Sequence, residues 1–376
     1  MKKKTLLVML LCILVASMFT LGACGGGGDG GGAADPPPPA DTGGGGDDDG
    51  DGGGAAPAPA SDADVSGKVV GVIPITLSNG FHQAEKIWRE KFAAEYGLTL
   101  KYLDGEFDQT IIVNNLDQLI AEGVDAIVLH TAEVDSVVAG VNEARAQGIP
   151  IIHYYLEVPN EIPFVAINEA EAAYVMGQEA AKAWVEQHPD EPIVYSVVDY
   201  IDNPSVQTMR TQPFIAGLKD VAPDAKEGKI IDGGGTRDTG YKAAQDIIQA
   251  APETNIFYGA SSDYSLAIWP ALQEAGRGKA ADGVVETEIL VGTDATGEEM
   301  KLLFDPASSF KVTMGLTPKD NGKAIIDTMV AVMTGAIDPD KKVTIDTYDK
   351  EFDFWNTTIE DAREWYIDQY GMEPEF

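Results

Sequence analysis

The chain has 376 residues, and its 61 acidic side chains against 26 basic ones give a formal net charge of -35 at pH 7. Such an excess of negative charge argues against nucleic acids and other polyanions as partners. Both cysteines, Cys12 and Cys24, lie close to the N-terminus. We therefore expect the folded part to contain no disulfide, no cysteine nucleophile and no thiolate metal site.

The first residues have the pattern of a secretory signal. Lysines at positions 2–4 precede an apolar run, 6–19, that is too short for a comfortable membrane span. The run ends in Leu21, Gly22, Ala23 and Cys24, which resembles the bacterial lipobox. This resemblance implies removal of residues 1–23, lipidation of Cys24 and anchoring on the extracytoplasmic side of a bacterial membrane. A plain signal peptide with a chance cysteine is the alternative.

Residues 24–66 follow the signal and consist mostly of glycine, alanine, proline and aspartate. Such a segment cannot bury enough apolar surface to fold. As a Gly-rich coil it would span roughly 35–40 Å between its ends. We interpret it as a tether that holds a folded domain away from the membrane.

The remaining residues, 67–376, are more than one hydrophobic core usually holds, so we expect two lobes. The first half alternates predicted strands with predicted helices, without hairpin signals, which favours a parallel, doubly wound sheet. The expected strands are 69–73, 98–103, 125–130, 149–155 and 164–168, and the expected helices are 81–94, 110–121 and 132–146.

The same alternation restarts after residue 168. A helix over 169–187 leads to a strand over 192–198, and then to a helix with Asn203 as its cap and Pro204 at its first position. Strands follow at 229–232, 255–259, 289–293 and 310–316, and a helix at 318–333. The acidic, aromatic tail ends in a predicted helix, 359–370. The fold class is therefore α/β, with two doubly wound parallel-sheet lobes.

Ligands of open α/β sheets bind at the carboxyl ends of the strands, and several polar residues lie there. Asn79 and Phe81 follow the first strand, Arg210 lies in the first helix after residue 200, and Asp294 follows a late strand. These positions and the element order over 67–345 resemble the type I periplasmic sugar-binding proteins, the ribose-binding and galactose-binding group. The resemblance implies two lobes joined by a multi-strand hinge that close over a ligand. It places lobe 1 at 67–168 and 317–345, lobe 2 at 169–316, and a C-terminal extension at 346–376.

The chain also departs from that family at positions where sugar binders often carry polar ligands. An expected asparagine is His130, an aspartate-arginine pair is replaced by Tyr155 and Leu156, and a glutamine by Leu316. Ser261, Ser262 and Asp263 stand near another expected asparagine-aspartate pair. The pocket is therefore remodelled, and the sequence does not identify the ligand.

The position of Arg210 in its predicted helix is a second reason to consider it as a ligand-binding residue. It lies on the inward side of its predicted helix, four residues from both Val206 and Phe214, where an unpaired guanidinium would be destabilising. It could donate hydrogen bonds to vicinal hydroxyls of a ligand. A structural salt bridge with Asp199 or Asp202 is the alternative.

Three histidines, His82, His130 and His153, each lie at or just beyond the carboxyl end of a predicted first-lobe strand. Three imidazoles could bind zinc, but no two of them have the spacing of a tight ligand pair. Histidine also forms hydrogen bonds with hydroxyl groups. We therefore expect no metal site and no cofactor.

These observations predict an extracytoplasmic solute-binding lipoprotein of an ABC importer, a monomer that presents a sugar-like ligand to membrane permease subunits. A lipoprotein that senses a ligand for a kinase or chemoreceptor, and a secreted carbohydrate-active enzyme, are the alternatives. No serine-hydrolase elbow or metalloprotease motif is present, so we expect no catalysis. The expected ligand-binding residues are Asn79, Phe81, His82, His130, Tyr155, Arg210, Ser261, Asp263 and Asp294.

Overall fold

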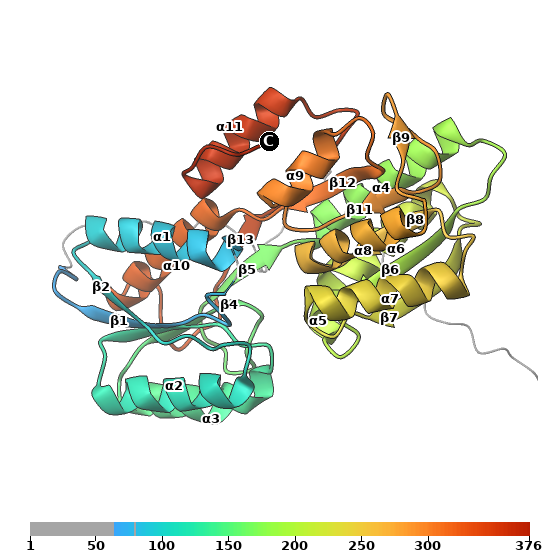
Figure 1. Ribbon diagram of the computed structural model, residues 1–376. Coiled ribbons are helices and arrows are strands. Elements are labelled where there is room, and N and C mark those ends of the chain that lie inside the picture. Colours follow the sequence, from blue (N-terminus) through green and yellow to red (C-terminus); the bar gives the residue numbers. More distant parts are fainter. Residues whose placement is uncertain (1–63, 79) are drawn as a thin grey trace, which may run out of the picture. The chain divides into compact units, whose positions relative to one another are not determined.

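The computed structural model describes residues 64–78 and 80–376 (Figure 1). The predicted signal segment, the lipobox with Cys24, the tether up to residue 63 and the candidate Asn79 lie outside the described residues. Within the described ranges, no helix is both long and apolar enough to cross a membrane.

The first sheet has six parallel strands in the order β13-β5-β4-β3-β1-β2. Their apolar residues are buried on both faces, as expected for a parallel sheet covered by helices on each side. The strands are β1 (Val69–Ile73), β2 (Thr99–Tyr102), β3 (Ala126–Leu129), β4 (Ile151–Tyr155), β5 (Phe164–Asn168) and β13 (Thr344–Tyr348).

Two pairs of helices cover this sheet, one on each face (Figure 1). Helices α1 (Gly80–Glu95) and α10 (Pro318–Met333) pack together and share a core with Val70, Val72 and Val128. Helices α2 (Gln109–Glu122) and α3 (Val134–Ala146) pack on the other face, against Ile73 and Ile127. The alternate residues of each strand thus serve two separate cores.

The second sheet also has six strands, in the order β14-β12-β11-β8-β6-β7, and β14 is its one antiparallel member among the described strands. Two short strands, β9 (Ala280–Ala281) and β10 (Val284–Val285), form a separate ribbon. The strands of the sheet are β6 (Val194–Asp199), β7 (Lys226–Asp232), β8 (Ile256–Gly259), β11 (Ile289–Val291), β12 (Phe310–Gly315) and β14 (Lys350–Asp353).

Helices α4 (Ala170–Gln187) and α6 (Gln212–Val221) approach each other unusually closely in the second lobe. A Cβ atom on Gly177 would collide with the carbonyl oxygen of Phe214, and one on Gly217 with that of Tyr174. This contact fixes α6 and the segment that precedes it. The remaining elements are α5 (Pro204–Val206), the π-helical turn η1 (Gln207–Thr211), α7 (Arg237–Ala250), α8 (Ser262–Glu274), α9 (Gly297–Phe304) and α11 (Ile359–Tyr370).

The predicted fold class is confirmed, and β1, β5, α10 and α11 have the predicted bounds. The Asn203 side chain accepts a hydrogen bond from the Val206 amide, as expected for a cap. The expectation of purely parallel sheets was wrong for β14. Residues 346–376, expected as an extension, contribute to β13 in the first sheet and supply β14 in the second. Their alternating charged residues conceal these strands in the sequence.

The chain passes between the two sheets at three places, and a polar residue lies at each crossing. Glu169 lies between β5 and α4, Thr317 between β12 and α10, and Asp349 between β13 and β14. The Thr317 amide donates a hydrogen bond to Asp349 Oδ1 at 3.3 Å, so two of the crossings are in direct contact. These residues form the base on which the candidate site is built.

Candidate functional site

Tyr155 is the last residue of β4, and its backbone has a φ of 75°. Residues other than glycine rarely adopt this conformation, and such strain often occurs at functional sites. The phenol donates a hydrogen bond to the Glu169 carboxylate and accepts one from Arg210 Nη2 at 2.9 Å. Burial and the Glu169 carboxylate raise the pKa of this phenol well above its ordinary value, so it remains a donor.

Arg210 lies in η1 and is only 7% exposed. Its Nη2 donates to Glu169 Oε1 at 2.8 Å, its Nε donates to Glu169 Oε2, and its Nη1 donates to the Ala260 carbonyl at 2.7 Å. Burial alone would lower the pKa of the guanidinium, but Glu169 raises it well above its ordinary value. The arginine is therefore held charged in a bidentate pair.

The acid that pairs with Arg210 is thus Glu169, whereas the sequence suggested Asp199 or Asp202. Asp199 Oδ1 accepts hydrogen bonds from Thr211 Oγ1 and the Tyr200 amide, each at 2.8 Å. Glu169 is fully buried and is the residue before α4, yet its side chain makes no capping hydrogen bond to that helix. Its carboxylate contacts Arg210 and Tyr155 instead.

Asp294 follows β11 and also has a positive φ, 94°. Its Oδ2 accepts hydrogen bonds from the amide and the hydroxyl of Ser262, at 3.0 and 2.7 Å. Its Oδ1 lies 3.9 Å from Arg210 Nη1, which is too far for a hydrogen bond. Ser261 is nearly buried, and its hydroxyl accepts a hydrogen bond from Tyr200 at 3.2 Å.

Asp349, at the third crossing, completes the group of charged residues. Burial, followed by the Glu169 carboxylate, raises the pKa of its carboxyl well above the ordinary value. Its Oδ2 is buried and has no hydrogen-bond partner among the described residues. We call Tyr155, Glu169, Arg210, Asp294 and Asp349 the crossing cluster.

The first-lobe candidates form a row of aromatic rings that ends at Tyr155. The ring centroids of Phe81 and His82 are 5.1 Å apart, and those of His82 and His130 are 5.8 Å apart. His130 stacks on Tyr155 with centroids 4.9 Å apart and an interplanar angle of 14°. Burial lowers the pKa of His130 well below its ordinary value, so its imidazole is neutral. Its buried Nδ1 has no hydrogen-bond partner among residues 64–78 and 80–376.

His153 and Asp263 form their hydrogen bonds and ion pairs with residues outside these groups. His153 Nδ1 contacts the Leu156 carbonyl, and its ring lies 6.5 Å from that of Phe164. In the described part of the chain, no group of three or more potential ligand side chains is arranged to hold a metal ion. The Asp263 side chain is half exposed and lies 3.5 Å from Arg237 Nε, on the surface of the second lobe.

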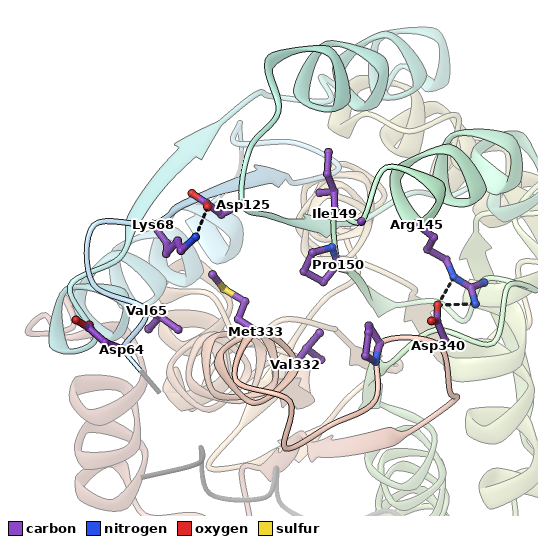
Figure 2. Close-up of a pocket in the computed structure, with 12 residues that line it drawn as sticks. Asp64, Val65, Lys68, Asp125, Arg145, Ile149, Pro150, Val332, Met333 and Asp340 are labelled. Atoms are coloured by element: carbon purple, nitrogen blue, oxygen red, sulfur yellow. Dashed lines mark hydrogen bonds and ion pairs between the residues drawn. The ribbon is translucent and has the colours of Figure 1, made fainter. Parts of the chain in front are cut away.

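A cavity of about 400 Å³ lies at the opposite, amino end of the first sheet. Figure 2 shows the Lys68 and Asp125 pair and the Arg145 and Asp340 pair at its rim, with distances of 2.7 and 2.8 Å. Met333 and other apolar side chains form part of its wall. Because ligands of open α/β sheets bind at the carboxyl ends of strands, we do not assign the ligand site to this cavity.

Comparison with known proteins adds a family match. Residues 70–337 match the family model described as periplasmic binding protein domain. The chain is 21% identical over 291 residues to the D-ribose/D-allose-binding protein of Pseudomonas aeruginosa, which covers 70% of this chain and 88% of that protein. It is 22% identical over 223 residues to the ribose import binding protein RbsB of Bacillus subtilis, which covers 58% of this chain and 70% of that protein.

Solved structures have a similar fold. A galactofuranose binding protein superposes with a TM-score of 0.66 and 19% identity, covering 81% of this chain and 99% of that one. A second structure is the periplasmic binding protein component of the arabinose ABC transporter from Shewanella sp. ANA-3, bound to alpha and beta-L-arabinofuranose. It superposes with a TM-score of 0.65 and 19% identity, covering 79% of this chain and 94% of that one. At this level of identity, the similarity establishes the fold.

Proposed function

Because the chain belongs to the periplasmic binding protein domain family, we propose that it binds a monosaccharide, or a related polyhydroxy compound, for an ABC importer. The family consists of non-catalytic, extracytoplasmic solute-binding proteins with the type I two-lobe fold. The sugars named for its relatives, ribose, allose and arabinofuranose, support a sugar as the ligand. We therefore assign no enzymatic activity to the chain.

The observation that carries this proposal is the composition of the crossing cluster. Tyr155 belongs to the first sheet, Arg210 and Asp294 belong to the second lobe, and Glu169 and Asp349 belong to the crossings. A ligand that touches these groups would contact both lobes. It would stabilise the closed form by its greater affinity for that form, and the closed form would be recognised by the permease subunits.

The ligand contacts in this proposal come from both lobes. Lobe 1 is taken as residues 67–168 and 317–345, and lobe 2 as residues 169–316. The aromatic faces of Phe81 and Tyr155 would cover the C–H patches of a sugar ring. The polar groups would exchange hydrogen bonds with its hydroxyls. The proposed polar contacts are Asn79, His82, His130, Arg210, Ser261, Asp263 and Asp294.

A lipid anchor on Cys24, with residues 24–66 as its tether, is the second part of the proposal. We expect Cys24→Ala to release the protein from the membrane fraction and to abolish incorporation of labelled palmitate. Cys12→Ala is the matched control, since Cys12 lies within the proposed signal peptide and should not affect labelling. Labelling that persists in Cys24→Ala would disprove anchoring at this residue.

Calorimetric titration of the purified full chain tests the ligand class. Candidate ligands are ribose, allose, arabinose, galactose and myo-inositol, added after the protein has been unfolded, washed and refolded to remove any ligand carried through purification. We expect one of them to bind with micromolar affinity and to stabilise the protein by about 2.7 kcal/mol at a hundred times its Kd. Binding of a non-hydroxylated solute in their place would overturn the sugar assignment.

A further inference from the structure

The charge of Arg210 is already neutralised within the protein. Glu169 holds the guanidinium through two hydrogen bonds, and the Tyr155 hydroxyl accepts a third from the same arginine. An arginine that recognises an anion offers its paired N–H groups to the anion itself. In this protein, the edge of the guanidinium formed by Nε and Nη2 is occupied by Glu169.

Asp294 adds a further carboxyl group beside this pair. Asp294 Oδ1 lies 3.9 Å from Arg210 Nη1, and the electrostatic influence of both Glu169 and Asp294 reaches Asp349. The cluster therefore has three carboxyl groups and one guanidinium. An anionic group placed between Arg210 and Asp294 would be repelled by Asp294 and would have to compete with Glu169.

A hydroxyl group of a ligand, in contrast, could occupy the position between Arg210 and Asp294. An arginine has five N–H donors, and Nη1 gives one of its two to the Ala260 carbonyl. A hydroxyl oxygen about 2.8 Å from each neighbour could accept from the other Nη1 hydrogen and donate to Asp294 Oδ1. A protonated amine could donate to Asp294 as well, but a carboxylate or phosphate could not.

We propose that Glu169 determines the charge specificity of the site: by occupying Arg210, it leaves uncharged and amine-bearing sugars as ligands and excludes sugar acids and sugar phosphates. This inference rests on the proposed function, because it concerns the same site. Glu169 acts through Arg210 and through repulsion of anions. Discrimination by an unfavourable charge is a general route to specificity.

The test uses the wild-type full chain and Glu169→Gln, with galactose, galactosamine, galacturonate and inorganic phosphate as calorimetric probes at low ionic strength. Wild type should bind galacturonate and phosphate at least 100-fold more weakly than the neutral sugar identified in the calorimetric screen. Glu169→Gln should gain at least tenfold in affinity for galacturonate, because the guanidinium then lacks its carboxylate partner. Glu171→Gln is the matched control, an exposed acid in the first turn of the same helix.

Glu169→Asp keeps the negative charge and should reject galacturonate as wild type does. The proposal is overturned if wild type binds galacturonate or phosphate as tightly as a neutral sugar, or if folded Glu169→Gln gains no affinity for either anion. If Glu169→Gln does not fold, the comparison of wild type with these anions decides. Because the anion probes are read separately, a failure to bind any neutral sugar would count against the proposed function alone.

Discussion

Among the described residues, two glutamate-arginine pairs have both side chains buried, and they differ in how the fold brings the partners together. Glu85 and Arg89 are four residues apart on α1, with Oε2 and Nη2 at 2.6 Å. Glu169 and Arg210 are 41 residues apart, and they join the first crossing to η1. The first pair forms within one helix, whereas the second forms only when a crossing segment and the second lobe are correctly placed. We therefore expect changes in the local pair to affect mainly the stability of one lobe, and changes in the long-range pair to affect mainly the proposed ligand site.

The strongest expected effect is on ligand binding, from Arg210→Ala. The change removes the Nη1 donor that a ligand hydroxyl would use and leaves Glu169 without its guanidinium partner. We expect affinity for the identified sugar to fall about a thousandfold, close to 4 kcal/mol, in calorimetric titration of the folded variant. If the variant binds the sugar normally, Arg210 is not part of the ligand site.

Arg89→Ala is the matched change in the local pair. Arg89 is 1% exposed, and its guanidinium lies 4.5 Å from the centre of the Tyr154 ring. Its removal leaves the buried Glu85 without its guanidinium partner and with only the His82 imidazole, 3.1 Å away, so we expect the free energy of unfolding to fall by about 3–5 kcal/mol. Affinity of the folded molecules should fall less than in Arg210→Ala, because Arg89 is linked to the proposed ligand contacts indirectly, through Glu85 and His82.

The control for Arg89→Ala is Lys86→Ala, on the same helix. Lys86 forms a partly exposed pair with Glu90 at 3.2 Å. We expect this change to alter stability by about 0.5 kcal/mol or less. Equal losses from Arg89→Ala and Lys86→Ala in urea denaturation would show that the buried pair has no special role in the first lobe.

The two lobes were predictable from the sequence, but the long-range pair was not. Continuous apolar strands followed by amphipathic helices define the sheets, and the position of Arg210 on an inward helix face required a partner. The sequence gives no reason to predict Glu169 as a site residue. Acidic residues are common just before a helix because they interact favourably with the helix dipole. Nothing local indicates that the partner of Glu169 lies 41 residues away.

Asp349 escaped notice for a related reason. It lies in a segment, 344–353, whose charged residues alternate with apolar ones, and the sequence predicts a C-terminal extension from residue 346 onward. In the structure, this segment forms β13 and β14, and Asp349 between them lies at a crossing. Whether such a segment forms a strand depends on its pairing with distant strands, and this pairing exists only in the assembled sheets.

The free energy of unfolding should depend on pH through two buried groups, His153 and Asp349, and the two dependences should have opposite signs. Burial lowers the pKa of His153 from 6.5 to about 3, so the folded state binds fewer protons than the unfolded state between these values. The corresponding stability is present above pH 6.5 and is lost as the pH falls toward 3. We expect His153 to reduce the free energy of unfolding by about 2 kcal/mol between pH 7 and pH 5.

The measurement is thermal and chemical unfolding of wild type and His153→Leu at both pH values. The variant should lose less stability on acidification, whatever its absolute stability. Parallel pH profiles for wild type and His153→Leu would contradict burial of a neutral His153.

Asp349 should give a pH dependence of the opposite sign. Its pKa is raised by burial and by Glu169, so the stability linked to its proton is present at low pH and is lost as the pH rises through the raised pKa. An asparagine side chain cannot ionise, so we expect the stability of Asp349→Asn relative to wild type to be greater at pH 8 than at pH 5.

If Asp349→Asn instead loses stability at pH 8, the crossing cluster requires a charged carboxylate at this position even without ligand. The unpartnered Oδ2 of Asp349 would then have to be compensated by Arg210. The long-range pair would in that case be a three-residue network, and Arg210 could not be assigned to Glu169 alone.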